Sequence, residues 1–165
     1  MTIPHRGRTS EATYFVTADC WEKKRLLQSE RMATLLIDVL YHYRVQRKYL
    51  LHEFVVMPNH LHLLISPSGS TLERTMQLIK GGFSFRAGKE FSMKAEIWQT
   101  SFYDRRVRDL VEYVRFRDCI HSNPVKAGLT STPEEWPYAS VNGRLELDDV
   151  PQRLKPFSKA ADMQA

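Results

Sequence analysis

The feature that most constrains this chain is the segment 52–66, in which two apolar runs meet at the pair Pro58-Asn59. Residues 51–57 and 60–66 are rich in the aliphatic and aromatic residues that favour β-strands. A Pro-Asn pair suits a tight turn, because proline presets φ and asparagine tolerates positive φ. The segment therefore predicts an antiparallel hairpin of two neighbouring strands.

The second strand of this hairpin opens with His60-Leu61-His62. Alternate side chains of a strand share a face, so the two histidines are predicted to point the same way and Leu61 to point into a core. Two imidazoles on one face can hold a divalent metal and leave coordination positions open for a substrate. The spacing also allows two solvent-facing histidines on a half-exposed strand, and only a third ligand elsewhere would decide between these interpretations.

The other segments alternate between strand-like and helix-like patterns. Ser29 is a predicted N-cap for a helix whose apolar residues continue to Tyr43. The remaining predictions are a strand at 13–18, a helix from 71 to about 87, a fourth strand and its exit at 96–104, and a third helix from about 109 to 123, stopped by Pro124.

The order strand, helix, strand, strand, helix, strand predicts an α+β fold of the ferredoxin-like, split βαβ type. Its antiparallel sheet would carry helices on one face, and the third helix would lie across the other face. At 165 residues the chain is long enough for one domain with a real core. We expect that domain to span residues 1–144 and a polar tail to span residues 145–165.

Composition narrows the class of protein further. The net charge of +5, from 24 Lys plus Arg against 19 Asp plus Glu, favours a polyanionic partner. Cys20 and Cys119 have neither zinc nor redox spacing. No apolar run approaches the length of a membrane span, and the first residues lack the apolar core of a signal peptide. The simplest expectation is a reduced, cytoplasmic protein with no membrane association.

The third predicted helix carries two residues of chemical interest, Cys119 and Asn123. They lie one turn apart and share a face. The Asn123 side-chain oxygen could complete a metal shell begun by His60 and His62. The other interpretation is that Asn123 only ends a helix ahead of Pro124, which is a common use of asparagine.

Three segments together resemble a known family. They are Met57-Pro58-Asn59-His60-Leu61-His62-Leu63-Leu64, the segment 97–104 (IWQTSFYD) and the segment 119–129 (CIHSNPVKAGL). In this order and spacing they look like the three signatures of the REP-associated tyrosine transposases, relatives of the single-tyrosine HUH transposases of bacterial insertion sequences. The segment 133–140 (PEEWPYAS) is similar to the family as well. The resemblance covers about residues 13 to 141.

The resemblance implies a function and a set of site residues. Members of the family act on REP-like single-stranded hairpin DNA by metal-assisted strand cleavage and transfer, with Mg²⁺ or Mn²⁺. The family's HUH pair falls on His60 and His62, and its asparagine ligand falls on Asn123. The family suggests a monomer, whereas the insertion-sequence relatives are dimers, so a monomer and a homodimer both stay open.

The family's catalytic tyrosine falls on Cys119, and this is the main departure from its pattern. In the family the phenol oxygen attacks a phosphodiester, frees a 3′-hydroxyl and keeps a 5′-phosphotyrosine link. A cysteine thiol is shorter and softer, and its reactivity depends on its thiolate character. We favour the interpretation that Cys119 is a small buried residue that does not cleave DNA over thiol catalysis.

Two other tyrosines are candidates to replace the missing phenol. Tyr113 is six residues before Cys119, which turns its side chain by about 240° and moves it about 9 Å along the helix. Tyr103 follows the fourth predicted strand and could approach from another side. Both are predicted to be packing residues.

Basic residues gather near these motifs, and such clusters neutralise phosphates. A solvated charged face would look the same, but the nearby His-x-His pair favours DNA contact. The candidate DNA-binding residues are Arg6, Arg8, Lys80, Arg86, Arg105, Arg106, Arg108 and Arg115.

The sequence thus predicts a DNA-binding transposase-family protein in which catalysis is impaired by Cys119. Two other functions stay open. One is a hairpin-DNA-binding protein without catalysis, which Cys119 favours. The other is a metal-dependent phosphoesterase that acts on small substrates through an activated water, and this function predicts activity on simple phosphodiesters without a preference for hairpins.

Overall fold

The fold was obtained as a computed structural model, which describes residues 12–154. Four strands form one sheet in the order β2-β3-β1-β4, and every neighbouring pair is antiparallel. This order is that of a ferredoxin-like sheet, so the predicted fold class is confirmed. The strands are β1 (Thr13–Asp19), β2 (Tyr49–Met57), β3 (His60–Pro67) and β4 (Tyr103–Val107).

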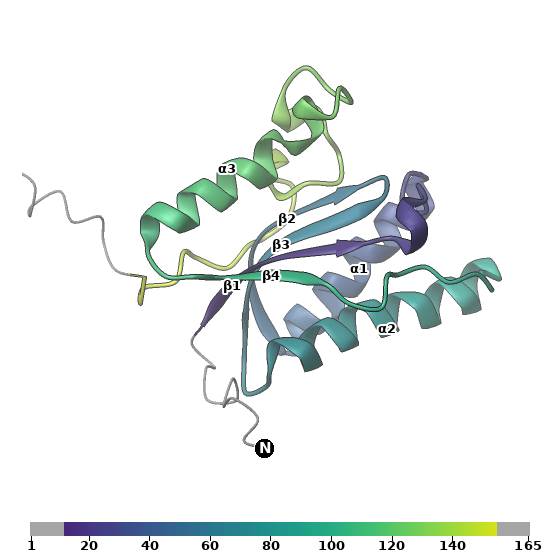
Figure 1. Cartoon of the computed structure of the whole chain (residues 1–165), viewed down its shortest axis with the longest axis horizontal. Coiled ribbons are helices and arrows are strands. Elements are labelled where there is room, and N and C mark those ends of the chain that lie inside the picture. The colour runs from purple at the N-terminus through teal and green to yellow at the C-terminus, as the bar shows by residue number, and fades with distance from the viewer. Residues whose placement is uncertain (1–11, 155–165) are drawn as a thin grey trace, which may run out of the picture.

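Helices cover both faces of this sheet, as Figure 1 shows. The helices α1 (Glu30–Val45) and α2 (Leu72–Phe91) lie together on one face. The helix α3 (Leu110–Lys126) lies across the other face. Three short 3-10 helices are η2 (Trp21–Lys23), η3 (Pro133–Glu135) and η4 (Ser140–Asn142). No helix in residues 12–154 is long and apolar enough to cross a membrane.

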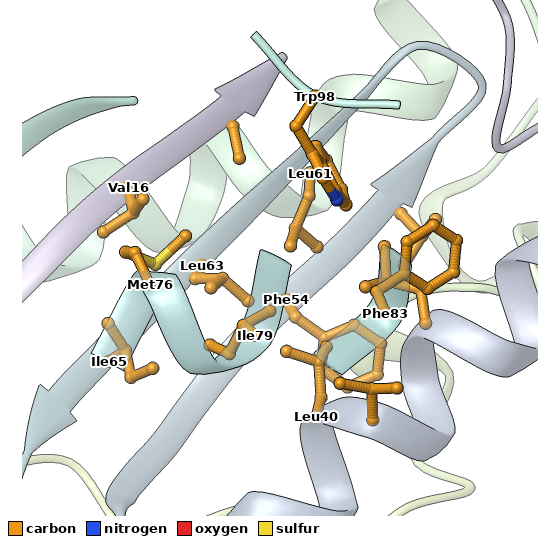
Figure 2. Packing of buried hydrophobic residues seen from close by; sticks show 14 of the residues in the cluster. Val16, Leu40, Phe54, Leu61, Leu63, Ile65, Met76, Ile79, Phe83 and Trp98 are labelled. Carbon is orange, nitrogen blue, oxygen red and sulfur yellow. The ribbon is translucent and has the colours of Figure 1, made fainter. Parts of the chain in front are cut away.

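The larger core lies between the sheet and the helices α1 and α2. Figure 2 shows Leu61, Leu63 and Ile65 of β3 packing with Met76 and Ile79 of α2 in this core. The helices pack closely because α2 carries a glycine at their contact. A Cβ atom at residue 82 would lie only 2.6 Å from the Tyr43 hydroxyl of α1.

A second, smaller core lies on the opposite face of the sheet, under α3. It joins Phe15 of β1 and Leu64 of β3 to Tyr113 and Ile120 of α3. Because β3 is an inner strand with a core on each face, the side chains on both of its faces pack against other residues. The small size of this second core leaves room on the same face for polar side chains.

The predicted hairpin is present, with Met57 paired to His60 across a two-residue turn. The turn does not use the positive φ that asparagine tolerates, because Asn59 is not among the residues with left-handed backbone in residues 12–154. The turn is held from outside instead. The Pro58 and Asn59 carbonyls accept hydrogen bonds from the Leu27 and Cys20 amides, each at 2.9 Å.

Two predicted boundaries are wrong. The fourth strand begins at Tyr103 rather than at residue 96, and before it Trp98 makes only an isolated bridge with Cys20. The helix α3 continues through Pro124 to Lys126. A proline in the last turn removes one backbone hydrogen bond, and the amides of residues 127–129 still bond back to the carbonyls of residues 123–125.

The segment after residue 136 runs along the free edge of β2. The Val56 amide donates to the Tyr138 carbonyl at 2.8 Å, and farther along Asp148 accepts from the Leu51 amide at 2.8 Å. Asp148 also accepts two hydrogen bonds from Arg44, each at 2.9 Å. The described part of the predicted polar tail is thus packed on the domain, with Leu154 buried.

Candidate functional site

Two histidines of β3 share the face of the sheet that carries α3. Their ring centroids lie 4.6 Å apart. Both rings pack where β1 pairs with β3, opposite Asp19 for His60 and opposite Thr17 for His62. The predicted common face is therefore observed. The interpretation as two solvent-facing residues is wrong for His62, which is buried, with only 8% of its surface exposed.

Each imidazole is oriented by a hydrogen bond to its Nδ1 atom. The Asn59 side-chain oxygen accepts from His60 Nδ1 at 2.7 Å. The Thr17 hydroxyl lies 2.9 Å from His62 Nδ1. Since these bonds occupy Nδ1 on both rings, the Nε2 atoms are the ones left for a ligand.

Burial keeps both imidazoles neutral. Loss of solvation lowers the pKa of His60. It also lowers the pKa of His62 to about 4, helped by the neighbouring His60. A neutral imidazole presents a free lone pair, which is the form that binds metals.

The helix α3 brings Asn123 to the same place. Its side chain makes a hydrogen bond with the His60 ring, which opposes the lowering of the His60 pKa without outweighing burial. An aromatic stack sets the position of the helix over the pair. The centroid of the Phe15 ring lies 5.2 Å from that of the His62 ring and 4.6 Å from that of the Phe116 ring of α3.

A second contact holds the far side of α3. His121 Nε2 lies 3.0 Å from a Glu53 carboxylate oxygen of β2. The Ser140 hydroxyl donates to the same carboxylate oxygen. Glu53 follows an irregularity in the pairing of β2 with β3, which lies between Leu51 and Glu53. The helix is therefore fixed along both of its flanks.

Cys119 lies on the exposed part of α3. The interpretation of Cys119 as a small buried residue is wrong. At 100° per residue its side chain is turned by about 40° from that of Asn123, one turn away. The flank that carries it faces away from His121, whose side chain reaches β2. Cys119 is thus free to meet a ligand from solvent.

The two alternative tyrosines differ in their surroundings. Tyr113 is buried, as predicted for a packing residue, and burial raises the pKa of its phenol. Tyr103 contradicts the same prediction, because 61% of its surface is exposed. It stands at the start of the edge strand β4.

Tyr103 borders a surface hollow of about 360 Å³ beside the histidine pair. Its lining residues are Thr17, Asp19, Lys23, His60, His62 and Tyr103. Sequence reasoning missed three of these as site residues, namely Thr17, Asp19 and Lys23. For Thr17 and Asp19 a signal existed, because they alternate with Val16 and Ala18 along a predicted strand. No signal in the sequence pointed to Lys23. It reaches the hollow from a turn in which two successive non-glycine residues have positive φ, and such a backbone is not expected from these residue types.

The predicted DNA-binding residues are divided between the two faces. Four of them are exposed arginines that make no ion pair within residues 12–154: Arg105 and Arg106 of β4, Arg108 between β4 and α3, and Arg115 of α3. Arg105 pairs with Phe15 and lies on the face that carries α3, whereas Arg106 pairs with Tyr14 and lies on the face that carries α1 and α2. Two others belong to α2, on that second face. Lys80 donates to the carbonyls of Gln99 and Ser101, and Arg86 pairs with Glu90. Arg6 and Arg8 lie outside the described residues.

The donor set suits a divalent ion only if the asparagine takes part. Within residues 12–154, no three His, Cys, Asp or Glu side chains are grouped so that they could hold a metal. Two imidazole nitrogens and one amide oxygen make a mixed set that leaves coordination positions open for oxygen ligands. The neutral rings and their fixed Nδ1 atoms fit such an ion.

Comparison with known proteins gives a consistent result. A family model described as "Transposase IS200 like" matches residues 9–109. The REP-associated tyrosine transposase of Escherichia coli (strain K12) is 25% identical over 153 residues, which cover 92% of this chain and 86% of that protein. A Haemophilus influenzae protein provisionally named REP-associated tyrosine transposase is 24% identical over 170 residues, 92% of each chain.

A solved structure supports the fold. It is described as the structure of a REP-associated tyrosine transposase bound to a REP hairpin, and it is similar with a TM-score of 0.67. The sequence identity is 24%, and the similarity covers 89% of each chain. At this identity the likeness establishes a shared fold.

The two cysteines are expected to differ sharply in their reactivity toward alkylating reagents. Cys20 is buried, which raises the pKa of its thiol to about 12, whereas Cys119 is exposed. In the folded protein, iodoacetamide at mildly alkaline pH should modify Cys119 alone, because only an accessible thiolate reacts. Peptide mass spectrometry would locate the label, and Cys119→Ser should abolish it. Equal labelling of Cys20 without denaturant would contradict the packing described here.

Proposed function

Because the chain belongs to the family of IS200-like transposases, we propose that it binds single-stranded DNA folded into REP-like hairpins and that its histidine pair marks the place of the scissile phosphate. One observation carries this proposal. His60, His62 and Asn123 come together on the face of the sheet that also carries Arg105 of β4 and the exposed Arg115 of α3, which make no ion pair within residues 12–154. Phosphate binding and phosphate chemistry thereby have adjacent sites on one surface.

We propose further that His60, His62 and Asn123 hold Mg²⁺ or Mn²⁺. The support is the convergence of the three side chains and the neutral state of both rings. When bound, such an ion supplies Lewis-acid polarisation of the phosphate. Thr17 and Asn59 have the positioning role, because they fix the ring orientations through Nδ1.

The position of the family's nucleophile is occupied by Cys119, and we propose that cleavage is impaired for this reason. Its exposure makes the thiol accessible, so burial is not the obstacle. The obstacle is reach and chemistry. A thiol sulfur attached directly to Cβ stops several ångströms short of a tyrosine oxygen, and positioning of the attacking atom governs the rate.

A hairpin-DNA-binding protein without catalysis is the second candidate function. The cysteine at position 119 favours it, since every contact proposed for DNA binding is independent of that side chain. The phosphoesterase predicted as another alternative differs in its substrate. It would hydrolyse simple phosphodiesters and would show no preference for hairpins.

Metal binding is expected to depend on the histidine pair and on the side chains that orient the two rings. His60→Ala should weaken Mn²⁺ binding by at least about tenfold, and Thr17→Val should weaken it about 10- to 100-fold through the loss of the bond to His62. Free Mn²⁺ measured by electron paramagnetic resonance would report both effects. The matched control is His42→Ala, which removes an exposed histidine of α1. Equal binding by all four proteins would contradict the proposed site.

Hairpin binding is expected to weaken steeply with salt, because phosphate contacts release counterions. Arg105→Ala should lower the affinity and reduce the slope of log K against log salt by about one. Fluorescence anisotropy with a labelled hairpin at several salt concentrations would measure both. Arg86→Ala is the control, since Arg86 pairs with Glu90 on the opposite face. Equal affinity for hairpin, random single strand and duplex would count against specific recognition.

The catalytic part of the proposal is tested at position 119. With Mn²⁺ and a labelled hairpin, the unaltered protein should give little or no nicking. Cys119→Tyr should give nicking and a covalent protein–DNA adduct on a denaturing gel, because the phenol oxygen is restored at the family's position. Cys119→Phe provides the ring without the oxygen and should stay inactive.

Three other results of this assay would each identify a different reaction. A strong adduct from the unaltered protein that is lost in Cys119→Ser would point to thiol catalysis. An adduct that survives Cys119→Ser would point to Tyr103 or Tyr113. Release of product from simple phosphodiesters without any adduct would favour the phosphoesterase.

A further inference from the structure

A β-bulge in β2 turns two consecutive side chains toward α3. Leu51 and Phe54 both lie in the core under α1 and α2. An unbroken alternation would instead put residues 51 and 53 on one face and residues 52 and 54 on the other. The alternation is interrupted because Leu51 and Glu53 pair with consecutive residues of β3, which leaves His52 as the extra residue. His52 and Glu53 therefore both face α3, where each contacts a ring of that helix.

The Glu53 carboxylate joins segments that are distant in the sequence. Its oxygen accepts hydrogen bonds from His121 Nε2 of α3, at 3.0 Å, and from the Ser140 hydroxyl of η4. Ser140 in turn accepts a hydrogen bond from the Phe54 amide of β2 at 2.9 Å. Only 12% of the Glu53 side chain is exposed, so these donors replace water as partners of the carboxylate. Such a carboxylate holds the helix firmly, because leaving it without a donor costs more than losing a surface contact.

His121 and Asn123 lie on opposite flanks of α3. At about 100° per residue, their side chains are about 200° apart around the helix axis. Phe116 lies within about 20° of Asn123, so the stack of Phe116 on Phe15 is on the same flank as Asn123. Ile120 is fully buried between the two flanks. The contact of His121 with β2 is therefore placed to oppose a rotation of the helix about its own axis.

A small rotation of α3 is enough to disrupt the proposed metal site. A helix with its side chains has a radius of about 5–6 Å, so a turn of about 20° moves the end of a side chain by about 2 Å. Metal–ligand distances tolerate only about 0.2 Å. The hydrogen bond between the Asn123 side chain and the His60 ring would also break at such a displacement. The rotation of the helix therefore decides whether Asn123 can act together with the histidine pair.

We propose that Glu53 is a positioning residue for the metal site, because its hydrogen bond with His121 fixes the rotation of α3 and thereby holds the Asn123 side chain beside His60. In this role Glu53 touches neither the ion nor the DNA and acts through the helix. The bulge gives β2 this role, since regular alternation would direct a side chain at position 53 into the opposite core. This inference rests on the proposed metal site and adds what places its third ligand.

The affinity for Mn²⁺, measured by electron paramagnetic resonance of the free ion, tests this role. Glu53→Ala should weaken binding about 2- to 30-fold, which is the range for changes that act on a site without contacting its ligand. In the Asn123→Ala background the same change should have no further effect, because no third ligand is left to place. Glu53→Gln should bind as the unaltered protein does, since its amide oxygen keeps an acceptor at the same reach.

Two further variants separate positioning from a general loss of stability. Arg44→Ala removes two hydrogen bonds to Asp148, each of 2.9 Å, on α1, and it should lower the thermal midpoint without changing the Mn²⁺ affinity. His121→Ala should weaken Mn²⁺ binding as Glu53→Ala does, and at 24% exposure its side chain is easier to remove than that of Glu53. Without metal, amide hydrogen exchange of α3 should be faster in Glu53→Ala and His121→Ala and unchanged in Arg44→Ala.

Two outcomes would overturn the inference. The first is a Mn²⁺ affinity of Glu53→Ala and His121→Ala equal to that of the unaltered protein, while Asn123→Ala binds more weakly. The second is a further loss of affinity when Glu53→Ala is added to Asn123→Ala, which would make the effect independent of the asparagine. In both cases the proposed metal site would stand. Absence of Mn²⁺ binding by the unaltered protein would instead defeat the metal site and this inference together.

Discussion

The pairing of β1 with β3 is the constraint on which the site depends. The strand β3 is an inner strand, so its alternation sends Leu61 and Leu63 into the core under α1 and α2 and sends His60 and His62 to the opposite face. A register shift by one residue would bury both imidazoles among leucines. Such a shift would desolvate polar rings without partners and expose apolar side chains, and the hairpin thereby fixes the site as firmly as the fold.

The docking of α3 supplies what the sheet lacks, because the sheet offers only two of the three convergent side chains. The stack of Phe15 against Phe116 places the helix above β1 and β3, and the contact of His121 with Glu53 holds its other flank. These contacts bring Asn123 to His60 and turn Cys119 toward solvent. None of them depends on the chemical nature of residue 119, so the geometry can be retained while the nucleophile changes.

The sequence predicted the features of the fold that depend on the local pattern of apolar, polar and capping residues. The hairpin, the common face of the two histidines, the Ser29 cap and the order of elements are set by side-chain period and capping chemistry, and the resemblance to the REP-associated tyrosine transposases is confirmed by the family match and the relatives. Tertiary contacts decided the remaining features. The exposure of Tyr103 follows from its edge strand, and the docking of Asp148 follows from a partner, Arg44, about a hundred positions away.

Binding and cleavage place different demands on this surface. The proposed DNA binding would draw on Arg105 of β4, on Arg115 of α3 and on other exposed groups whose positions the sheet and helix fix. Cleavage needs all of that and, in addition, one atom at the correct distance from phosphorus, and the free-energy cost of misplacing that atom is steep. A single substitution at position 119 can therefore reduce cleavage by orders of magnitude while leaving the fold, the histidine pair and the DNA-binding face intact.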